Sequence, residues 1–298
     1  MSNPFDTGIL KNSQIKYNEP LSRHISFRLG GEAKRFILLD IADAPALLKE
    51  LAASGEKYAF LGNGTNVLVR DGGFDGTVIK LKSGEVQVNG GRLSVSAGTT
   101  LAQLAQTACE HSLTGLEFAH GIPGTVGGAV MMNAGAYGGE IKDVLVNTVY
   151  CTPEGEVRTL TQKEHRFGYR TSFFKEHPEY LILSAEFEPK RGESSEIKNA
   201  MAELARRRRE SQPLDKPSAG STFKRPEGYF AGKLIEDSGL KGFTIGGAQV
   251  SQKHAGFVIN AGNATCRDVL ALCSHIQKTV YDRFGVTLER EIKILGEE

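Results

Sequence analysis

The chain has 298 residues, enough for two or three domains, and its 40% hydrophobic and 24% charged residues are ordinary for a soluble globular protein. Its 36 Lys and Arg residues balance 35 Asp and Glu residues, so the overall charge does not suggest DNA or a membrane surface as a partner. Glycine is in excess at 35 residues, and clustered glycines indicate loops that bind a ligand.

Mixed strand and helix patterns occupy the first part of the chain. Residues 43–55 have the apolar periodicity of a helix, which Asp43 can cap and Gly55 can end. The predicted strands around this helix cover residues 36–39, 58–61, 67–70 and 77–81. We therefore expect a small β-α-β-β unit that ends near residue 82.

From Glu85 the pattern changes. EVQVNGGRLSVSAG alternates on both sides of NGG, which predicts a β-hairpin. A glycine-rich stretch at 120–140 disfavours a core helix, because each glycine costs roughly 0.5–1 kcal/mol relative to alanine. Around it we predict a helix over 99–112 and strands over 144–150, 157–161 and 180–187.

The last third begins with a predicted linker at 190–196 and a helix at 195–209. That helix ends in RRRR, a run that is usually a solvated helix end. A second amphipathic helix is predicted over 265–285, where Thr265 and Asp268 resemble a capping box. The final predicted strand, 288–295, would place Glu289 and Glu291 on one face.

The cysteines form no CxxC pair and no His/Cys spacing that fits zinc, so we expect no metal site. Cys266 and Cys273 lie seven residues apart on the predicted helix, as core thiols would. The N-terminal sequence does not resemble a signal peptide, and no apolar run approaches the ~18 residues of a membrane span. We expect a reduced, cytoplasmic protein without membrane insertion.

Two glycine-rich motifs could bind a ligand. LGNGTNVLV (61–69) could present backbone amides to an anion or form an ordinary hairpin turn. In HGIPGTVGGAVMMNAGAYGGE (120–140), the density of glycine suggests that something flat or anionic packs against the backbone. Together the motifs suggest a dinucleotide with a diphosphate, held without a Rossmann fingerprint.

Three further motifs carry candidate reactive groups. In FGYRTSFF, Arg170 lies among aromatic residues and could bind a carboxylate of a substrate or form an internal ion pair. In DKPSAGSTFKRPEGY, Ser221 is either a surface turn residue or a proton donor, and no GxSxG elbow supports a hydrolase. In LEREIKIL, a carboxylate near the chain end is usually only solvated.

Taken together, LGNGTNVLV, GIPGTVGGAVMMNAGAYGGE, GYRTSFF, SAGSTFKRP, AGKLIEDSGLKGFTIGGAQVS and LEREIKILG resemble the UDP-N-acetylenolpyruvoylglucosamine reductase family. The resemblance runs from about Arg23 to Gly296. It implies an α+β fold, with a two-part FAD-binding domain of the vanillyl-alcohol-oxidase (PCMH) type and a C-terminal α+β substrate-binding domain. The expected boundaries are 1–82 for the first FAD-binding subdomain, 83–192 with 287–298 for the second, and 193–286 for the substrate-binding domain.

The resemblance also implies an activity, the NADPH-dependent reduction of UDP-N-acetylglucosamine enolpyruvate to UDP-N-acetylmuramate for peptidoglycan synthesis. Hydride would pass from N5 of noncovalent FAD to C3 of the substrate, and Ser221 would protonate C2. Arg170 would stabilise the developing negative charge, as electrostatic catalysis requires, and Glu291 could assist at the carboxylate. The role of Glu291 rests on the resemblance alone.

Further positions follow from the same resemblance. The expected cofactor contacts are Gly62, Asn63, Gly64, Thr65, Asn66, Gly121, Ile122, Pro123, Gly124, Gly127, Gly128 and Asn133. The expected substrate contacts are Tyr169, Lys224, Arg225, Lys233, Lys241 and His254. The partner would be this small-molecule substrate, with no nucleic acid and no obligate protein partner.

The chain departs from the longer branch of the family, which inserts a loop with a lid tyrosine after the strand at 180–187. Here a short linker follows, so the chain resembles the shorter branch, and Arg225 puts a charge where relatives have an amide. Two other functions stay open: an FAD-dependent oxidase of the same fold, with His120 or Cys109 as attachment points to inspect, and a nonenzymatic nucleotide or RNA binder that uses the RRRR run.

Overall fold

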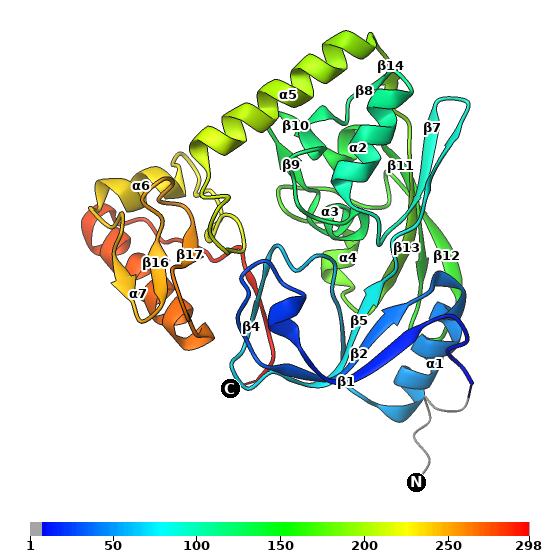
Figure 1. The fold of residues 1–298 in the computed structure, drawn as a ribbon, viewed down its shortest axis with the longest axis horizontal. Coiled ribbons are helices and arrows are strands. Elements are labelled where there is room, and N and C mark those ends of the chain that lie inside the picture. The colour runs from blue at the N-terminus through cyan, green and yellow to red at the C-terminus, as the bar shows by residue number, and fades with distance from the viewer. Residues whose placement is uncertain (1–7, 298) are drawn as a thin grey trace. The chain divides into compact units, whose positions relative to one another are not determined.

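The computed structural model describes residues 8–297. These residues form two compact units, which are described separately. The first holds residues 8–16, 35–62 and 76–207, and the second holds residues 17–34, 63–75 and 208–297. Figure 1 labels the elements of both units.

A four-stranded sheet contains most of the first predicted strands. Its order is β1 (Gln14–Pro20), β2 (Glu32–Leu39), β5 (Phe74–Leu81) and β3 (Tyr58–Phe60). β3 and β5 are parallel neighbours, so the chain between them must cross over rather than turn back in a tight hairpin. Helix α1 (Ala44–Ser54) follows β2 and buries Leu47, Leu48 and Leu51.

The predicted helix at 43–55 is confirmed, but the capping role of Asp43 is wrong. Gly55 ends the helix in the left-handed conformation, with φ of 64°. The Asp43 carboxylate instead accepts hydrogen bonds from the Asn12 amide at 2.9 Å and the Ser13 hydroxyl at 2.7 Å. A short 3-10 helix, Ile41–Asp43, precedes α1, and Asp40 caps it.

A five-stranded antiparallel sheet forms the other layer of the first unit. Its order is β12 (Val157–Thr161), β11 (Leu145–Cys151), β13 (Leu181–Phe187), β7 (Arg92–Ser96) and β6 (Val86–Asn89). Asn89 pairs with Arg92, so Gly90 and Gly91 form the two-residue turn. Both have positive φ, at 60° and 93°, which such turns require. The predicted hairpin is confirmed.

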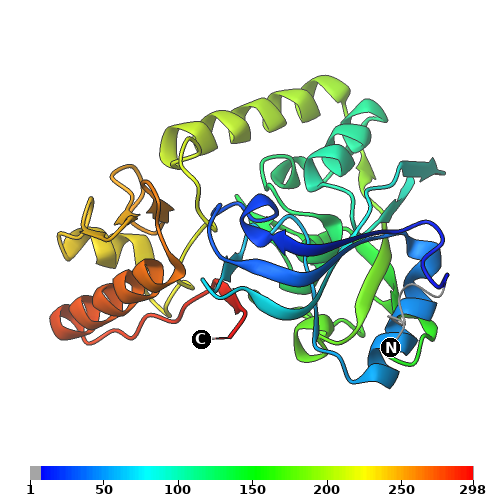
Figure 2. The same ribbon diagram turned by 60° about the horizontal axis from the view of Figure 1, so that its bottom comes forward.

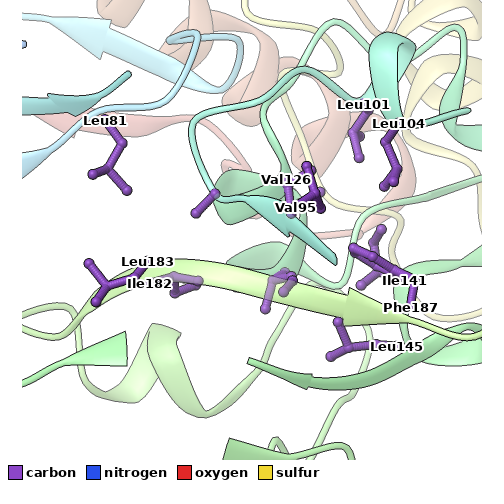
Figure 3. Close-up of a cluster of buried hydrophobic side chains, with 14 of the residues drawn as sticks. Leu81, Val95, Leu101, Leu104, Val126, Ile141, Leu145, Ile182, Leu183 and Phe187 are labelled. Carbon is purple, nitrogen blue, oxygen red and sulfur yellow. The ribbon is translucent and has the colours of Figure 1, made fainter. Parts of the chain in front are cut away.

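One apolar core joins these strands to two helices, as Figure 3 shows. Helix α2 (Leu101–Glu110) contributes Leu101 and Leu104, and Thr100 caps it as an N-cap residue should. Helix α3 (Val126–Met132) contributes Val126, and this helix contacts β7 and β13. The core therefore holds the start of the glycine-rich stretch rigidly against the sheet.

The prediction that the glycine density disfavours a core helix is wrong for residues 126–132. The Thr125 hydroxyl accepts a hydrogen bond from the Gly128 amide, which starts α3. A Cβ on Gly127 would lie 3.0 Å from the Cβ of Ala97. Glycine is tolerated in this helix because it allows the helix to lie close to the segment after β7.

Short elements complete the first unit. β8 (Leu113–Thr114) pairs with β14 (Lys190–Arg191), and β9 (Gly135–Ala136) pairs with β10 (Gly139–Glu140). Helix α4 is a single turn, Phe173–Glu176. Helix α5 (Ser194–Ser211) confirms the predicted helix at 195–209 and spans the boundary between the units.

The second unit contains a small antiparallel sheet with the order β15 (Thr244–Ile245), β16 (Ala248–Val250) and β17 (Val258–Asn260). Helix α7 (Cys266–Phe284) runs alongside it (Figure 2, orange to red), and α6 (Ala231–Asp237) contacts α7. The predicted capping box of Thr265 and Asp268 is confirmed, and Gly285 ends the helix with φ of 68°.

The chain end differs from its prediction. Only β18 (Lys293–Leu295) is a strand, and it pairs in parallel with β4 (Val67–Val69). Residues 288–292 are not a strand, so the argument that Glu289 and Glu291 share one strand face does not hold. Because β3 and β4 belong to different sheets, the GNGTN segment between them is not a hairpin turn.

The two units also divide the chain at positions other than the predicted domain boundaries, which stay a prediction. The expected second FAD-binding subdomain includes residues 287–298, whereas residues 287–297 fall in the second unit, where β18 pairs with β4. Among residues 8–297, no helix combines the length and the apolar character needed to cross a membrane.

Candidate active site

The first unit brings the beginning of one glycine motif against the other. A Cβ on Gly62 would lie only 2.5 Å from the hydroxyl oxygen of Thr125 in the second motif. Position 62 therefore requires glycine because the second motif packs against it. Among the described residues, the amides of Gly121, Gly124 and Thr125 donate to no backbone carbonyl. The Nδ1 atom of His120 is buried and has no hydrogen-bond partner within residues 8–297. The segment 120–125 thus presents several unused polar groups together.

Arg170 lies in a tight turn that hydrogen bonds fix at both ends. Gly168 and Thr171 exchange backbone hydrogen bonds of 3.2 and 3.4 Å, and Arg170 itself has φ of 56°. The Asn133 amide donates to the carbonyl of Gly168 at 3.1 Å. The Ser172 hydroxyl donates to the carbonyl of Met131 at 2.8 Å. These bonds attach the turn to the end of α3.

The cofactor contact of Asn133 stays a prediction, and in the structure its side chain also supports the turn of Arg170. It is 1% exposed, and besides Gly168 it donates to Glu140 at 3.0 Å and accepts from the Lys142 amide at 3.1 Å. With φ of 42°, Asn133 also ends α3 in the left-handed conformation that Asn tolerates. The side chain therefore supports the Arg170 turn.

A buried histidine lies beneath the same turn. His165 is fully buried, its ring stacks on Phe167 at 4.6 Å, and its Nε2 is 3.1 Å from the Thr148 hydroxyl. Its carbonyl accepts a hydrogen bond from Phe173 at 2.8 Å, which closes the loop around Arg170. Burial lowers the pKa of His165 to about 4, so the ring is neutral near pH 7.

In the second unit, Ser221 is exposed while the residue after it is buried and bonded on every side. The amide of Thr222 donates to the carbonyl of Gly256 at 2.9 Å. Its hydroxyl accepts from the Val258 amide at 3.0 Å, and its carbonyl accepts from the Glu291 amide at 2.9 Å. The backbone after Ser221 is therefore fixed, while Ser221 itself is exposed.

The same bonds place Glu291 next to the serine segment. Phe223 and Arg290 form an isolated antiparallel β-bridge through their backbones. The Lys224 amide donates to the carbonyl of Glu289 at 2.8 Å. The Asn66 side chain reaches the carbonyl of Glu291 at 3.2 Å. The structure thus brings together, within one unit, Ser221, Glu291 and the Asn66 end of the first glycine motif.

The cationic residues expected at the substrate are already paired on the protein surface. Lys224 pairs with Glu289, Lys233 with Asp237 at 2.6 Å, and Lys241 with Glu236 at 2.8 Å. Exposed ion pairs of this kind contribute about 0–1 kcal/mol, so a phosphate could compete for these cations. The guanidinium of Arg225 lies 3.9 Å from the ring centre of Phe230. In the first unit, Tyr169 is exposed and lies 5.7 Å below the Arg170 guanidinium.

His254 differs from these cations because its ring is half-buried. The Gly256 amide donates to its Nδ1 at 3.1 Å, so the neutral ring carries its proton on Nε2. Burial, the largest cause, lowers the pKa of His254, and the nearby Lys241 adds to this shift. Near pH 7 the residue is therefore a neutral hydrogen-bond donor.

Sequence reasoning did not identify Thr222, Ser172 or His165 as parts of the site. Thr222 and Ser172 stand inside quoted motifs and His165 lies two residues before one, but the residues around them carry no signal for their bonds. Ser172 bonds to a carbonyl 41 residues away, and Thr222 to an amide 36 residues away. Only the folded chain reveals such pairs.

Comparison with known proteins supports the expected class. Residues 212–295 match the C-terminal domain family of UDP-N-acetylenolpyruvoylglucosamine reductase, and residues 36–161 match a family of FAD binding domains. The UDP-N-acetylenolpyruvoylglucosamine reductase of Caldanaerobacter subterraneus subsp. tengcongensis is 50% identical, with 97% of this chain and 96% of that protein covered. That of Exiguobacterium sibiricum is 47% identical, with 98% and 96% covered.

A solved structure agrees with these sequences. The crystal structure of UDP-N-acetylenolpyruvylglucosamine reductase from Thermus caldophilus has a TM-score of 0.80 and 35% identity, and the match covers 95% of this chain and 99% of that one. Fold and matched domains define a flavoprotein oxidoreductase with a PCMH-type FAD-binding domain and a C-terminal substrate domain. The chain belongs to the UDP-N-acetylenolpyruvoylglucosamine reductase family. The predictions of the family, the fold class and FAD are confirmed.

Proposed function

We propose that this protein reduces UDP-N-acetylglucosamine enolpyruvate to UDP-N-acetylmuramate, with NADPH as the reductant, in the synthesis of peptidoglycan precursors. The observation that carries the proposal is the joining of Ser221 and Glu291 by the backbone bonds of Thr222, in a chain that belongs to this family throughout its length. A cytoplasmic location fits the four free, buried cysteines, which suit a reducing compartment.

The residues of segment 120–125 fit a dinucleotide. The unused amides of Gly121, Gly124 and Thr125 suit an anionic group, and the buried Nδ1 of His120 has polar capacity that no described residue meets. We assign the cofactor to residues 62–66, 121–124, 127, 128 and 133. FAD, when bound and reduced by NADPH, supplies the hydride that adds to C3 of the enolpyruvyl group.

Ser221 donates the proton that C2 then requires. A serine hydroxyl is a weak acid and needs a strongly basic partner, which a carbanion next to a carboxylate provides. General acid catalysis of this kind contributes about 10²–10⁴ in rate when the donor is positioned. The bonds of Thr222 provide that positioning, because they fix the backbone on one side of Ser221.

Arg170 stabilises the negative charge that develops on the enolpyruvyl carboxylate. A guanidinium can bind a carboxylate with two parallel hydrogen bonds, and the turn from Gly168 to Thr171 holds this one ready. Glu291, if protonated, donates to the same carboxylate. The small-molecule substrate would extend toward Tyr169 and, at its diphosphate, toward Lys224, Arg225, Lys233, Lys241 and His254.

The test is a series of visible spectra of the purified protein without oxygen. We expect a yellow protein that bleaches with NADPH and regains its colour with UDP-N-acetylglucosamine enolpyruvate. In Ser221→Ala, bleaching should stay normal and the return of colour should slow by at least a hundredfold. A protein that is colourless and takes up no FAD would contradict the proposal.

The oxidase of the same fold is the second candidate and has a separate outcome in this series. Colour that returns only on admission of oxygen, with no effect of the enolpyruvyl nucleotide, would favour it. Mass spectrometry of the denatured chain tests the flavin linkage, since a noncovalent cofactor leaves the mass of the chain unchanged.

A further inference from the structure

The segment 24–26 lies against the first glycine motif. The Ser26 amide donates to the carbonyl of Gly64 at 3.2 Å. A Cβ on Gly64 would lie 2.6 Å from Ile25 Cγ2 and 2.7 Å from the carbonyl oxygen of His24. Gly64 therefore packs directly against Ile25 and His24, so the position of residues 63–66 depends on the position of this segment.

Ser26 also contacts the stretch that leads to Ser221. Its hydroxyl oxygen is 2.5 Å from the carbonyl oxygen of Ser218 and 3.3 Å from that of Gly64. The shorter contact takes the single hydroxyl proton, because one O–H group makes one strong hydrogen bond. Ser218 is itself bridged to Ile259 of β17 and lies three residues before Ser221.

The two bonds of Ser26 come from different parts of the residue. The backbone amide holds the glycine motif, and the side chain holds the serine stretch. Thr222 fixes the backbone after Ser221, whereas Ser26 fixes it before Ser221. The His24 ring beside it hydrogen-bonds Glu19 at 2.8 Å, which steadies the segment from its other side.

We infer that Ser26 is a positioning residue, which sets the distance between the glycine motif that holds the cofactor and the loop of the proton donor Ser221. The inference rests on the proposed function. A displacement of about 1 Å in a reacting group can reduce the rate about a hundredfold. The bond from Ser26 to Ser218 can therefore affect the rate by positioning the Ser221 loop, although Ser26 does not contact the substrate.

The variant Ser26→Ala tests the inference because it removes only the side-chain bond. The amide bond to Gly64 remains, so we expect unchanged FAD content and an unchanged rate of bleaching by NADPH. Reoxidation by UDP-N-acetylglucosamine enolpyruvate should slow by tenfold or more. The loss should appear in the limiting rate at saturating substrate rather than in the substrate concentration that gives half of that rate. Ser26→Thr keeps a hydroxyl and should recover most of the rate. Ser54→Ala, which removes a serine hydroxyl bonded to the carbonyl of Leu51 in the first unit, is the matched control and should change neither step.

Two results would overturn the inference: equal slowing of both half-reactions, or reoxidation at the wild-type rate in Ser26→Ala. If Ser26→Ala does not fold, Ser26→Cys keeps the volume with a much weaker donor, and the same comparison applies to it. Wild-type protein that bleaches but does not reoxidise with the enolpyruvyl nucleotide contradicts the proposed function instead, so the two failures are distinguishable.

Discussion

At the scale of single residues, the site depends on short polar side chains that bond to distant backbone. Ser172 and Asn133 hold the turn of Arg170, and Thr222 holds the segment of Ser221. None of these three is reactive in the proposed mechanism. They fix the backbone that carries the reactive side chain, which reduces the ordering that the transition state requires.

Arg170→Lys tests whether the charge or the shape of this residue matters. Lysine keeps the positive charge but cannot present two parallel donors to a carboxylate. We expect reoxidation by the enolpyruvyl nucleotide to slow by about 10²-fold, in line with the loss of one electrostatic contact in a transition state. Stopped-flow absorbance measures this step. Arg166→Lys is the control, because Arg166 pairs with Glu176 at the surface, and a similar slowing there would contradict the role of Arg170.

His165 predicts a pH dependence of stability. Its pKa is about 4 in the folded chain and about 6.5 when exposed, so between these values the unfolded chain binds more protons than the folded one. The stability contributed by the neutral ring is therefore present above pH 6.5 and is lost as the pH falls toward 4. We expect a loss of up to about 3 kcal/mol over this range.

Urea unfolding of wild type and His165→Gln at several pH values measures the effect. The glutamine amide can keep the bond to Thr148 but does not titrate, so the variant should lose less stability on acidification. His111→Gln, at an exposed site, should retain the wild-type pH dependence. Identical curves for wild type and His165→Gln would show that another group titrates.

At the scale of elements, glycine has two different uses in this chain. Gly90 has φ of 60° in the β6–β7 turn and open space around it, so it is needed only for its backbone conformation. Gly64 has a similar φ of 61° and, in addition, the segment 24–26 directly against it. The excess of glycine reflects close packing of the chain on itself as well as room for a ligand.

The pair Gly64→Ala and Gly90→Ala separates these uses. Both substitutions force alanine into the left-handed region, at a cost of about 1 kcal/mol. Gly64→Ala adds overlap with Ile25 and His24, which should cost roughly 1–3 kcal/mol more. Urea unfolding gives the two costs, and flavin absorbance should fall in the Gly64 variant alone. Equal costs would show that the contact relaxes freely.

At the scale of the whole molecule, a noncovalent cofactor links stability to ligand concentration. FAD that binds the folded chain and not the unfolded chain stabilises it by about 2.7 kcal/mol at a hundred times its dissociation constant. We expect the melting temperature of FAD-depleted protein to rise steadily as FAD is added. Riboflavin, which lacks the diphosphate, should have little effect. A melting temperature that FAD leaves unchanged would contradict the assignment of the glycine motifs.

Local signals determined a large part of this protein. The cap and end of α7, the turn of β6 and β7 and the helix α1 follow from residues within a few positions of one another, so the sequence by itself predicts them. The motifs of the family were also readable as a set, which identified the fold, FAD and the candidate residues Arg170, Ser221 and Glu291. The sequence did not predict the local geometry of these three residues, because the residues that contact a side chain in the fold need not be near it in the sequence.

Tertiary structure decided the rest. In the structure β4 pairs with β18, and Gly127 lies inside a helix. Glu291, which the sequence placed in a strand, instead donates its backbone amide to the carbonyl of Thr222. It also joined Ser26 to Ser218 across 192 residues of chain. Each of these depends on the packing of apolar faces and on backbone groups that must find partners on folding, and neither requirement leaves a pattern in the residues nearby.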